Sequence, residues 1–369
     1  MPEFRVLVLG GYGFFGRRLV KRLSRLSGSR IQVAGRSLAA AQALVQELQQ
    51  GTRARLEAVT VDAQDPGLES TLRRLAPTVM VNASGPFQGA DYRLPAACIR
   101  AGVHYADLAD GRDYVTGIDG LHEAALAAGV TVTSGASSVP ALSGAAVDFL
   151  AKDLSCVQAI DVGISPGNRT ERGLSTVRGI LTYCGKPLPA GGSAKVFGWT
   201  GARRRAYPSP VGTRLLSPCD VPDLTLFPLR YSGAPEVRFG AGLELEFLHR
   251  GMNLLAWMAR RGLVRDWSRH ATLLKRAADL FKTWGSDAGA MHVQVQGLDR
   301  TGSKVTRTWQ LVATEGHGPF VPTLAAAAFV RKIQAGALQP GASACVGILD
   351  LEDFMREMQG LAIRTEGFA

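Results

Sequence analysis

The first 150 or so residues alternate short apolar runs, rich in β-branched residues, with longer segments of helical pattern. The runs predict six strands, at residues 5–9, 31–34, 56–61, 78–82, 103–108 and 130–133. Apolar residues at three- and four-residue spacing in several intervening segments predict amphipathic helices. Glycines suited to ending them stand at Gly28, Gly51, Gly102 and Gly129. Because strands joined by such crossovers run parallel, we predict an α/β fold whose residues 1–152 form a doubly wound parallel Rossmann sheet.

The pattern changes after about residue 155. One further strand is expected at 156–165, followed by a region rich in glycine and proline and by helical segments at 250–264 and 267–284. Alternating residues on both sides of 299–303 predict a β-hairpin. We therefore expect a second, mixed α/β domain with an antiparallel sheet at 153–316, serving substrate binding and dimerisation. Helices at 321–336 and 351–363, within 317–369, are expected to pack back on the first domain.

A glycine-rich loop follows the first predicted strand and opens the first predicted helix. It reads Gly11, Tyr12, Gly13, Phe14, Phe15 and Gly16, the pattern Gly-x-Gly-x-x-Gly. In a dinucleotide site, Gly11 would permit the turn off the strand, Gly13 the approach of the pyrophosphate, and Gly16 close packing of the helix. The helix N-terminus then offers N–H groups to the phosphates. This context predicts a bound dinucleotide.

The end of the second predicted strand carries Arg36 and Ser37. An NAD enzyme usually has a carboxylate there, which hydrogen-bonds the ribose 2′-hydroxyl and would repel a 2′-phosphate. A guanidinium group pairs well with phosphate, so we expect NADP(H) in preference to NAD(H). The alternative is that Arg36 only stacks on the adenine ring.

Two further strand ends are expected to face the cofactor. Asp62 would accept a hydrogen bond from the adenine amino group or, alternatively, cap a helix. The fourth strand ends in Ala83, Ser84, Gly85 and Pro86, small or rigid residues that would allow close approach of the nicotinamide half.

Several segments resemble the saccharopine dehydrogenase-like oxidoreductases. The cofactor loop "VLVLGGYGFFGRRLVKRL" and the strand end "VAGRS" are similar to those of the family. So are "VNASGPFQGADYRLPAACIRAGVHYADLADG" and "SGASSVPALSGAAVDFLA". The resemblance covers roughly residues 5–150 and implies an NADP-linked enzyme that transfers hydride at a C–N bond or a related bond of a small substrate. It does not identify that substrate.

Candidate catalytic residues stand at the end of the fifth predicted strand, where ligands bind in this fold. Tyr105 and Asp107 lie two apart and so share a face, where one of them would handle a proton. The alternative is a capping and packing role. Ser138 would orient substrate or cap a helix, and Arg169 and Arg172 would bind a carboxylated substrate or, alternatively, lie solvated on the surface.

The composition of the chain limits which classes of partner and ligand we expect it to bind. The net charge of +11 comes without a nucleic-acid motif, five cysteines and six histidines are scattered, and no metal-binding spacing occurs. With no signal-peptide pattern near the start, we expect a cytoplasmic homodimer that binds a small molecule but neither metal nor nucleic acid. Arg203, Arg204 and Arg205 are expected in a disordered or exposed loop; the alternative is that they bind phosphate groups or an anionic membrane.

The region around Trp257 and Trp267, with neighbouring arginines, would form a core or dimer interface in preference to a peripheral membrane contact. The alternative to an enzyme is a membrane-associated or cofactor-sensing protein that keeps the fold without turnover.

Overall fold

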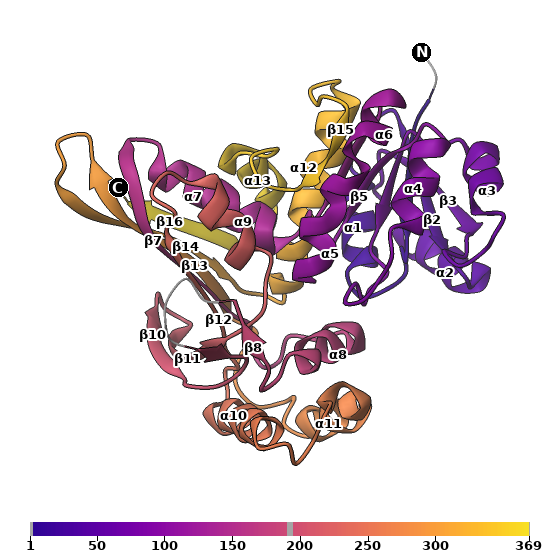
Figure 1. The fold of residues 1–369 in the computed structure, drawn as a ribbon. Coiled ribbons are helices and arrows are strands. Elements are labelled where there is room, and N and C mark those ends of the chain that lie inside the picture. The colour runs from indigo at the N-terminus through magenta and orange to yellow at the C-terminus, as the bar shows by residue number, and fades with distance from the viewer. Residues whose placement is uncertain (1–2, 190–194, 369) are drawn as a thin grey trace. The chain divides into compact units, whose positions relative to one another are not determined.

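The computed structural model describes residues 3–189 and 195–368 (Figure 1). The chain forms two compact units, each assembled from two stretches of sequence. The first comprises Met1–Leu142 and Phe320–Glu357, and the second Ser143–Pro319 and Met358–Ala369. The domain boundaries predicted from sequence were 152 and 316, whereas these units divide at 142 and 319, and the last residues return to the second unit.

A parallel sheet forms the centre of the first unit, in the order β15-β6-β5-β4-β1-β2-β3. Its strands are β1 Phe4–Leu9, β2 Ser29–Gly35, β3 Arg55–Thr60, β4 Val79–Asn82, β5 His104–Asp107, β6 Thr131–Ser134 and β15 Gly341–Ala344. All six predicted strands are present, and the order reverses between β1 and β4. The doubly wound sheet is therefore confirmed. The seventh strand, β15, was not predicted because its residues, Gly-Ala-Ser-Ala, carry no strand pattern.

Helices connect these strands. They are α1 Gly16–Leu23, α2 Leu38–Leu48, α3 Leu68–Leu75, α4 Arg93–Arg100, α5 Arg112–Thr116 and α6 His122–Ala127, with α12 Val321–Gln334 and α13 Leu351–Met358 added from the C-terminal part. The glycines predicted to end helices all have positive φ, between 67° and 82°. The segment after residue 111 is broken into two short helices and a 3₁₀ turn at Gly117–Leu121, where glycine disfavours a continuous helix.

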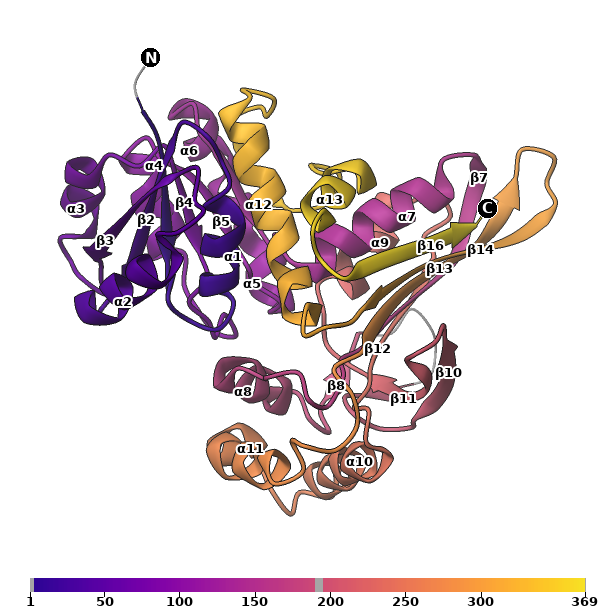
Figure 2. The same cartoon turned by 180° about the vertical axis from the view of Figure 1, so that it is seen from behind.

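The alanine-rich helix α12 is part of the core of the first unit. It packs against α1 and against β4 and β5, and a continuous run of its residues from Thr323 to Val330 is buried (Figure 2). Small alanine side chains permit this close approach. Glu357 in α13 adds a buried ion pair with Arg22 of α1 at 3.2 Å and a second pair with Arg331 of α12. The C-terminal part thus completes the first unit.

A mixed sheet forms the second unit, in the order β10-β11-β12-β7-β13-β14-β16. Its strands are β7 Leu154–Ser165, β10 Arg203–Tyr207, β11 Gly212–Pro218, β12 Glu236–Ala241, β13 Gly289–Asp299, β14 Lys304–Ala313 and β16 Ile363–Phe368, with a small pair β8 Pro187–Leu188 and β9 Val196–Phe197. The predicted hairpin is confirmed as β13 and β14, which pair from Gly289↔Ala313 to Leu298↔Lys304. Only β12 and β7 run parallel among the described strands of this sheet.

The helices of the second unit are α7 Ser143–Ala151, α8 Leu174–Thr182, α9 Asp223–Arg230, α10 Glu246–Arg260 and α11 Ala271–Asp279. Two expectations were wrong here. The last predicted helix, 351–363, ends at Met358, and after Gly360 at φ +74° the chain becomes β16, which pairs with β14. The three arginines expected in an exposed loop belong to β10.

Candidate cofactor site

The turn off β1 is made by Gly10, whose φ is +72°. The N–H of Gly13 donates to the Gly10 carbonyl oxygen at 2.8 Å, and a Cβ added to Gly16 would lie 2.0 Å from the same oxygen. Three glycines at three-residue spacing therefore build the loop. The role expected of Gly11 in the turn belongs to Gly10, and Gly11 instead packs where a Cβ would lie 2.9 Å from Val33.

The loop after β4 lies beside this turn. A Cβ on Gly10 would lie 3.1 Å from the Cβ and backbone nitrogen of Ser84 and 3.2 Å from the carbonyl carbon of Ala83. Asn82 holds that loop, because its side-chain oxygen accepts from the N–H of Ser84 at 3.0 Å and from the Ser84 hydroxyl. The Gly85–Pro86 peptide that follows is cis. The two predicted cofactor-facing segments are thus neighbours at the carboxyl edge of the sheet.

Tyr12 joins the glycine loop to the end of β2. Its hydroxyl oxygen accepts a hydrogen bond from the N–H of Ser37 at 3.0 Å. Its ring lies over Gly35, where an added Cβ would be 2.5 Å from Cε1 of Tyr12. Sequence reasoning placed Tyr12 in the loop but did not foresee this contact with β2.

The end of β2 has the character of an anion site. Arg36 is exposed and has no hydrogen bond or ion pair within the described residues. Ser37 is the N-cap of α2, with its side chain accepting from the N–H of Ala40 at 3.2 Å, and the first turn of α2 has no acidic residue. The positive end of the helix dipole and a free guanidinium therefore act at one place. These groups fit a 2′-phosphate.

The other predicted cofactor residues have simple local environments. Asp62 is exposed and its carboxylate accepts from the N–H of Gln64 at 3.0 Å. The helix-cap alternative for Asp62 is wrong, because α3 begins at Leu68 with Gly67 as its N-cap. Phe14 and Phe15 pack edge to face at 4.8 Å, and the Arg18 guanidinium lies 4.1 Å from the centre of the Phe14 ring.

Tyr105 and Asp107 lie together but are fully buried. One carboxylate oxygen of Asp107 accepts from the Ser134 hydroxyl and the N–H of Gly135, both at 2.9 Å, and from the N–H of Ala109 at 3.0 Å. Burial raises the pKa of Asp107 to about 6 and that of Tyr105 well above its usual value. These bonds tie the ends of β5 and β6, and they favour the capping and packing alternative for Asp107.

The predicted substrate residues belong to different units. Ser138 of the first unit is buried and begins the kinked segment Ser138–Leu142, in which Val139 has extended backbone at φ −130° and ψ 132°. In the second unit, Arg169 is exposed, and its Nε donates to the Thr283 carbonyl at 3.2 Å. Arg172 is half-buried, and burial lowers the pKa of its guanidinium. Both arginines therefore lie near α11 or the residues that follow it, since Arg169 contacts Thr283 and Arg172 is influenced by the charge of Asp279.

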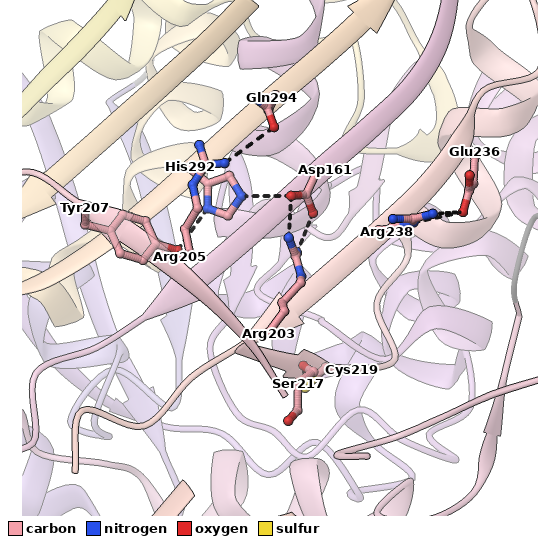
Figure 3. A network of polar contacts seen from close by, with 10 residues as sticks. All are labelled: Asp161, Arg203, Arg205, Tyr207, Ser217, Cys219, Glu236, Arg238, His292 and Gln294. Atoms are coloured by element: carbon pink, nitrogen blue, oxygen red, sulfur yellow. Dashed lines mark hydrogen bonds and ion pairs between the residues drawn. The ribbon is translucent and has the colours of Figure 1, made fainter. Parts of the chain in front are cut away.

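A polar network in the second unit was not foreseen (Figure 3). The Tyr207 hydroxyl lies 2.9 Å from Nδ1 of His292, whose Nε2 lies 3.4 Å from Asp161, and Arg203 pairs with the same carboxylate. His292 is fully buried, and its ring fits because Gly163 lies opposite: a Cβ there would be 2.3 Å from Cε1 of His292. The alternation of β10 was the available signal, since it sends Arg203 and Tyr207 to one face.

This network fixes the β10–β11 hairpin on the sheet. Arg203 also lines a cavity of about 160 Å³ together with Cys219 and Arg238. Ligand pockets for drug-sized molecules commonly have several hundred Å³, so this cavity is too small for a dinucleotide. Among the described residues, no group of three or more His, Cys, Asp or Glu side chains is arranged to bind a metal ion, and no helix is long and apolar enough to cross a bilayer.

Comparison with known proteins agrees with this geometry. Residues 6–133 match the family model of the saccharopine dehydrogenase NADP binding domain. A Mycobacterium tuberculosis protein described as a "putative trans-acting enoyl reductase" is 33% identical over 144 residues. That alignment covers 37% of this chain and 33% of the relative, so the chain matches about a third of the length of the curated relatives.

Solved structures extend the likeness to the second unit. A saccharopine dehydrogenase (L-Glu forming) from Saccharomyces cerevisiae superposes with a TM-score of 0.69 at 14% identity, covering 99% of this chain and 100% of that one. An amine dehydrogenase from Mycobacterium smegmatis gives a TM-score of 0.50 at 12% identity, over 92% and 94% of the two chains. Residues 6–133 therefore resemble the NADP binding domain of the saccharopine dehydrogenases, and the whole chain has the fold of saccharopine dehydrogenase.

Proposed function

We propose that the protein is an NADP(H)-dependent oxidoreductase that prefers NADP(H) to NAD(H). The observation that carries the proposal is the end of β2, where Arg36, Ser37 and the Tyr12 hydroxyl lie together and where neither residues 35–37 nor the first turn of α2 include an acidic residue. A 2′-hydroxyl would find no acidic acceptor there, whereas a 2′-phosphate would find a cation and a helix N-terminus.

The hydroxyl groups strengthen this preference. The Tyr12 oxygen already accepts the N–H of Ser37, which leaves its own hydrogen available to an acceptor. The Ser37 oxygen likewise accepts from Ala40 and keeps its hydrogen available. Both hydroxyls would donate to phosphate oxygens while Arg36 pairs with them, and charge-assisted bonds of this kind are stronger than neutral ones.

The chemistry proposed is hydride transfer at a C–N bond of a small, carboxylated substrate. When bound, the nicotinamide supplies or accepts the hydride. The activities named for the two similar solved structures, saccharopine dehydrogenase and amine dehydrogenase, support an amine or imine substrate. Ser138, Arg169 and Arg172 remain the proposed substrate contacts, with Arg169 having only its Nε engaged by the protein among the described residues.

For proton handling, we assign Asp107 a positioning role. Its bonds to Ser134 and Gly135 hold the carboxyl edge of β5 and β6 in place, and its burial keeps it from a substrate in this conformation. Tyr105, whose hydroxyl accepts from the Asn82 amide at 3.4 Å, is buried beside it. Replacing Tyr105 with Phe should therefore change the stability of the protein more than the pH profile of turnover. A shifted pH profile would restore Tyr105 as the acid or base.

A second candidate reaction is reduction of a C=C bond. It is favoured by the M. tuberculosis relatives, whose description names an enoyl reductase and whose similarity lies in a segment of 144 residues. Both reactions use the same cofactor site. They differ in whether the acceptor carbon is bonded to nitrogen or to another carbon.

The first experiment compares binding of NADPH and NADH by fluorescence titration. We expect NADPH to bind at least about tenfold more tightly, a difference of about 1.4 kcal/mol. Arg36→Ala should remove most of that difference, and Tyr12→Phe should weaken NADPH binding severalfold while leaving NADH binding nearly unchanged. Arg53→Ala, an exposed arginine of the same unit, is the matched control. Equal affinity for the two cofactors would contradict the proposed preference.

The second experiment identifies the bond. Purified protein with NADPH is offered mixtures of amines with keto acids or aldehydes, and separately a series of 2-enoyl thioesters, while NADPH consumption is followed. Consumption with the first set alone supports C–N chemistry, and consumption with the second set alone supports enoyl reduction. Tight NADPH binding without consumption in either set would favour the cofactor-sensing alternative.

A further inference from the structure

We propose that the second unit binds anionic lipid surfaces through α10 and the segment around α11. We call this region the α10–α11 surface and define it by the exposed apolar residues Phe247, Leu254, Trp257, Leu273, Leu280 and Trp284. The two helices lie next to each other in both views (Figures 1 and 2). The proposal is independent of the reaction and of the cofactor.

The outer face of α10 is an apolar stripe with cations in it. Phe247, Leu254 and Trp257, together with Arg250 and Arg261, follow one another at three- and four-residue spacing and are all exposed. Leu254 is 57% exposed and Trp257 48%. The opposite face is buried through His249 and Ala256. The stripe therefore faces away from the interior of its own unit, which excludes the core interpretation for Trp257.

The segment around α11 continues this surface. Leu273 and Leu280, seven residues apart, are 67% and 78% exposed, and Trp284 is 55% exposed. Phe247 joins this segment to α10, because its ring centre lies 4.9 Å from that of Phe281 and 6.0 Å from that of Trp284. Large apolar side chains from both helical segments thus stay in contact with water.

The charges of the region indicate an anionic partner. Residues 246–284 contain eight arginines and lysines but only three acidic residues. Each carboxylate already has a partner within the region: Glu246 pairs with Arg250, Asp266 with Arg269, and Asp279 with Lys275. The remaining cations, which form no ion pair within the described residues, are Arg260, Arg261, Arg265, Arg276 and Lys282. The Arg261 guanidinium lies 5.6 Å from the Trp257 ring centre.

An anionic lipid surface would accommodate both the exposed apolar side chains and the cations that lack an ion pair. Tryptophan and leucine side chains enter the interface between headgroups and acyl chains, and arginines with long apolar stems reach the phosphates. Each cation near such a surface adds to the attraction. A second copy of the chain fits less well, because it would bring another five unpaired cations to the same contact. Attachment here is peripheral, with α10 lying along the surface.

The test uses the whole 369-residue chain and vesicles of phosphatidylcholine, with or without phosphatidylglycerol. We expect sedimentation with the mixed vesicles, at least tenfold weaker binding to pure phosphatidylcholine, and weakening as salt is raised. Trp257 and Trp284 should show a blue shift and quenching by brominated lipid, whereas Trp199 and Trp309 are buried and should not respond. Equal binding to both vesicle types would overturn the proposal.

Two variants with matched controls separate the surface from net charge. Leu254→Ser with Trp257→Ser should reduce binding at least tenfold, whereas Leu229→Ser, which replaces an 83% exposed leucine of α9, should not. Arg261→Ser with Arg265→Ser should also weaken binding, and Arg53→Ser with Arg55→Ser removes the same charge from the first unit. Equal loss with both arginine pairs would overturn the proposal, since binding would then follow net charge alone.

Light scattering distinguishes the competing occupant. A subunit interface predicts three results: the protein is a dimer, the variant with Leu254→Ser and Trp257→Ser is a monomer, and the unmodified protein does not bind vesicles. If all three are observed, the surface is a subunit interface and the lipid proposal fails. Circular dichroism of each variant confirms that any loss of binding is not a loss of folding.

Discussion

The ring of Tyr12 occupies the space that any side chain at Gly35 would need, since a Cβ on Gly35 would lie 2.5 Å from Cε1 and 2.6 Å from the hydroxyl oxygen of Tyr12. The position of the Tyr12 ring therefore depends on the absence of a side chain at Gly35. Together the two residues set where the Tyr12 hydroxyl stands relative to Ser37 and Arg36.

Gly35→Ala should move the Tyr12 ring and weaken NADPH binding about tenfold, while changing NADH binding much less. The reason is that the hydroxyl leaves the N–H of Ser37 and the proposed phosphate position. Titration of both cofactors measures the effect. Gly120→Ala is the control, because a Cβ there meets nothing within 4 Å. Unchanged discrimination between the cofactors in Gly35→Ala would contradict a role for Tyr12.

Asp223 should make stability depend on pH. It is fully buried, and burial raises its pKa to about 7 despite the smaller opposing effect of the Ser143 hydroxyl. In the unfolded chain it ionises near pH 4. The folded state therefore holds the proton more tightly, and the free energy of unfolding should fall by on the order of 3 kcal/mol as pH rises from about 4 to about 7.

Asp223→Asn should remove that part of the pH dependence. Urea unfolding at pH 4.5 and pH 8 measures it, and the difference between the two pH values should be smaller in the variant. Asp113→Asn, which replaces a carboxylate with an 87% exposed side chain, is the control. A variant that keeps the full dependence would assign it to other groups.

Gly163→Ala should destabilise the protein by on the order of 2 to 3 kcal/mol, because the new Cβ would lie 2.3 Å from Cε1 of His292 and 2.8 Å from Leu216. Chemical denaturation measures the loss. In a His292→Ala background the same substitution should cost less, as expected of residues in contact. Gly251→Ala, at an open position in α10, should be neutral or stabilising.

Glu357→Ala should cost about 3 kcal/mol of unfolding free energy. It leaves the guanidinium of Arg22 buried without its carboxylate, and burial already lowers the pKa of Arg22. Glu47→Ala breaks the exposed pair with Arg17 at 3.0 Å and should cost well under about 1 kcal/mol. Similar losses for the two variants would show that the buried pair has no special weight.

Local patterns predicted the first six strands, β7 and the β13–β14 hairpin because each signal lies within a few neighbouring residues. The same reasoning was wrong at the loop. Gly11 is the residue that fits the motif, but the preceding Gly10 makes the turn, and only the fold decides which of two adjacent glycines takes positive φ. Local patterns also could not predict contacts between strands that are distant in sequence. The Asp161–His292 pair joins residues far apart in sequence, and the residues around each of them carry no pattern that predicts the contact.

The position of Tyr105 and Asp107 at a strand end was predicted, but their burial was not. Burial depends on what covers the strand end, and that includes Tyr114, whose interaction with Tyr105 follows from the path of the chain after β5. Similarly, the exposure of Trp257 could not be read from helical spacing, which gives the relative faces of a helix but not which face the rest of the unit covers.

The first unit receives α12 and β15 only after residues 143–319, the larger stretch of the second unit, have been translated. During synthesis, the edge of β6 that later pairs with β15 therefore remains unpaired, and the apolar surface that α12 later covers remains exposed to water. Such exposed edges and surfaces are what chaperones recognise in nascent chains and what drives aggregation when they persist. A premature stop shortly before Phe320 would thus leave the N-terminal, cofactor-binding half unfinished, even though every residue of its glycine loop had been made.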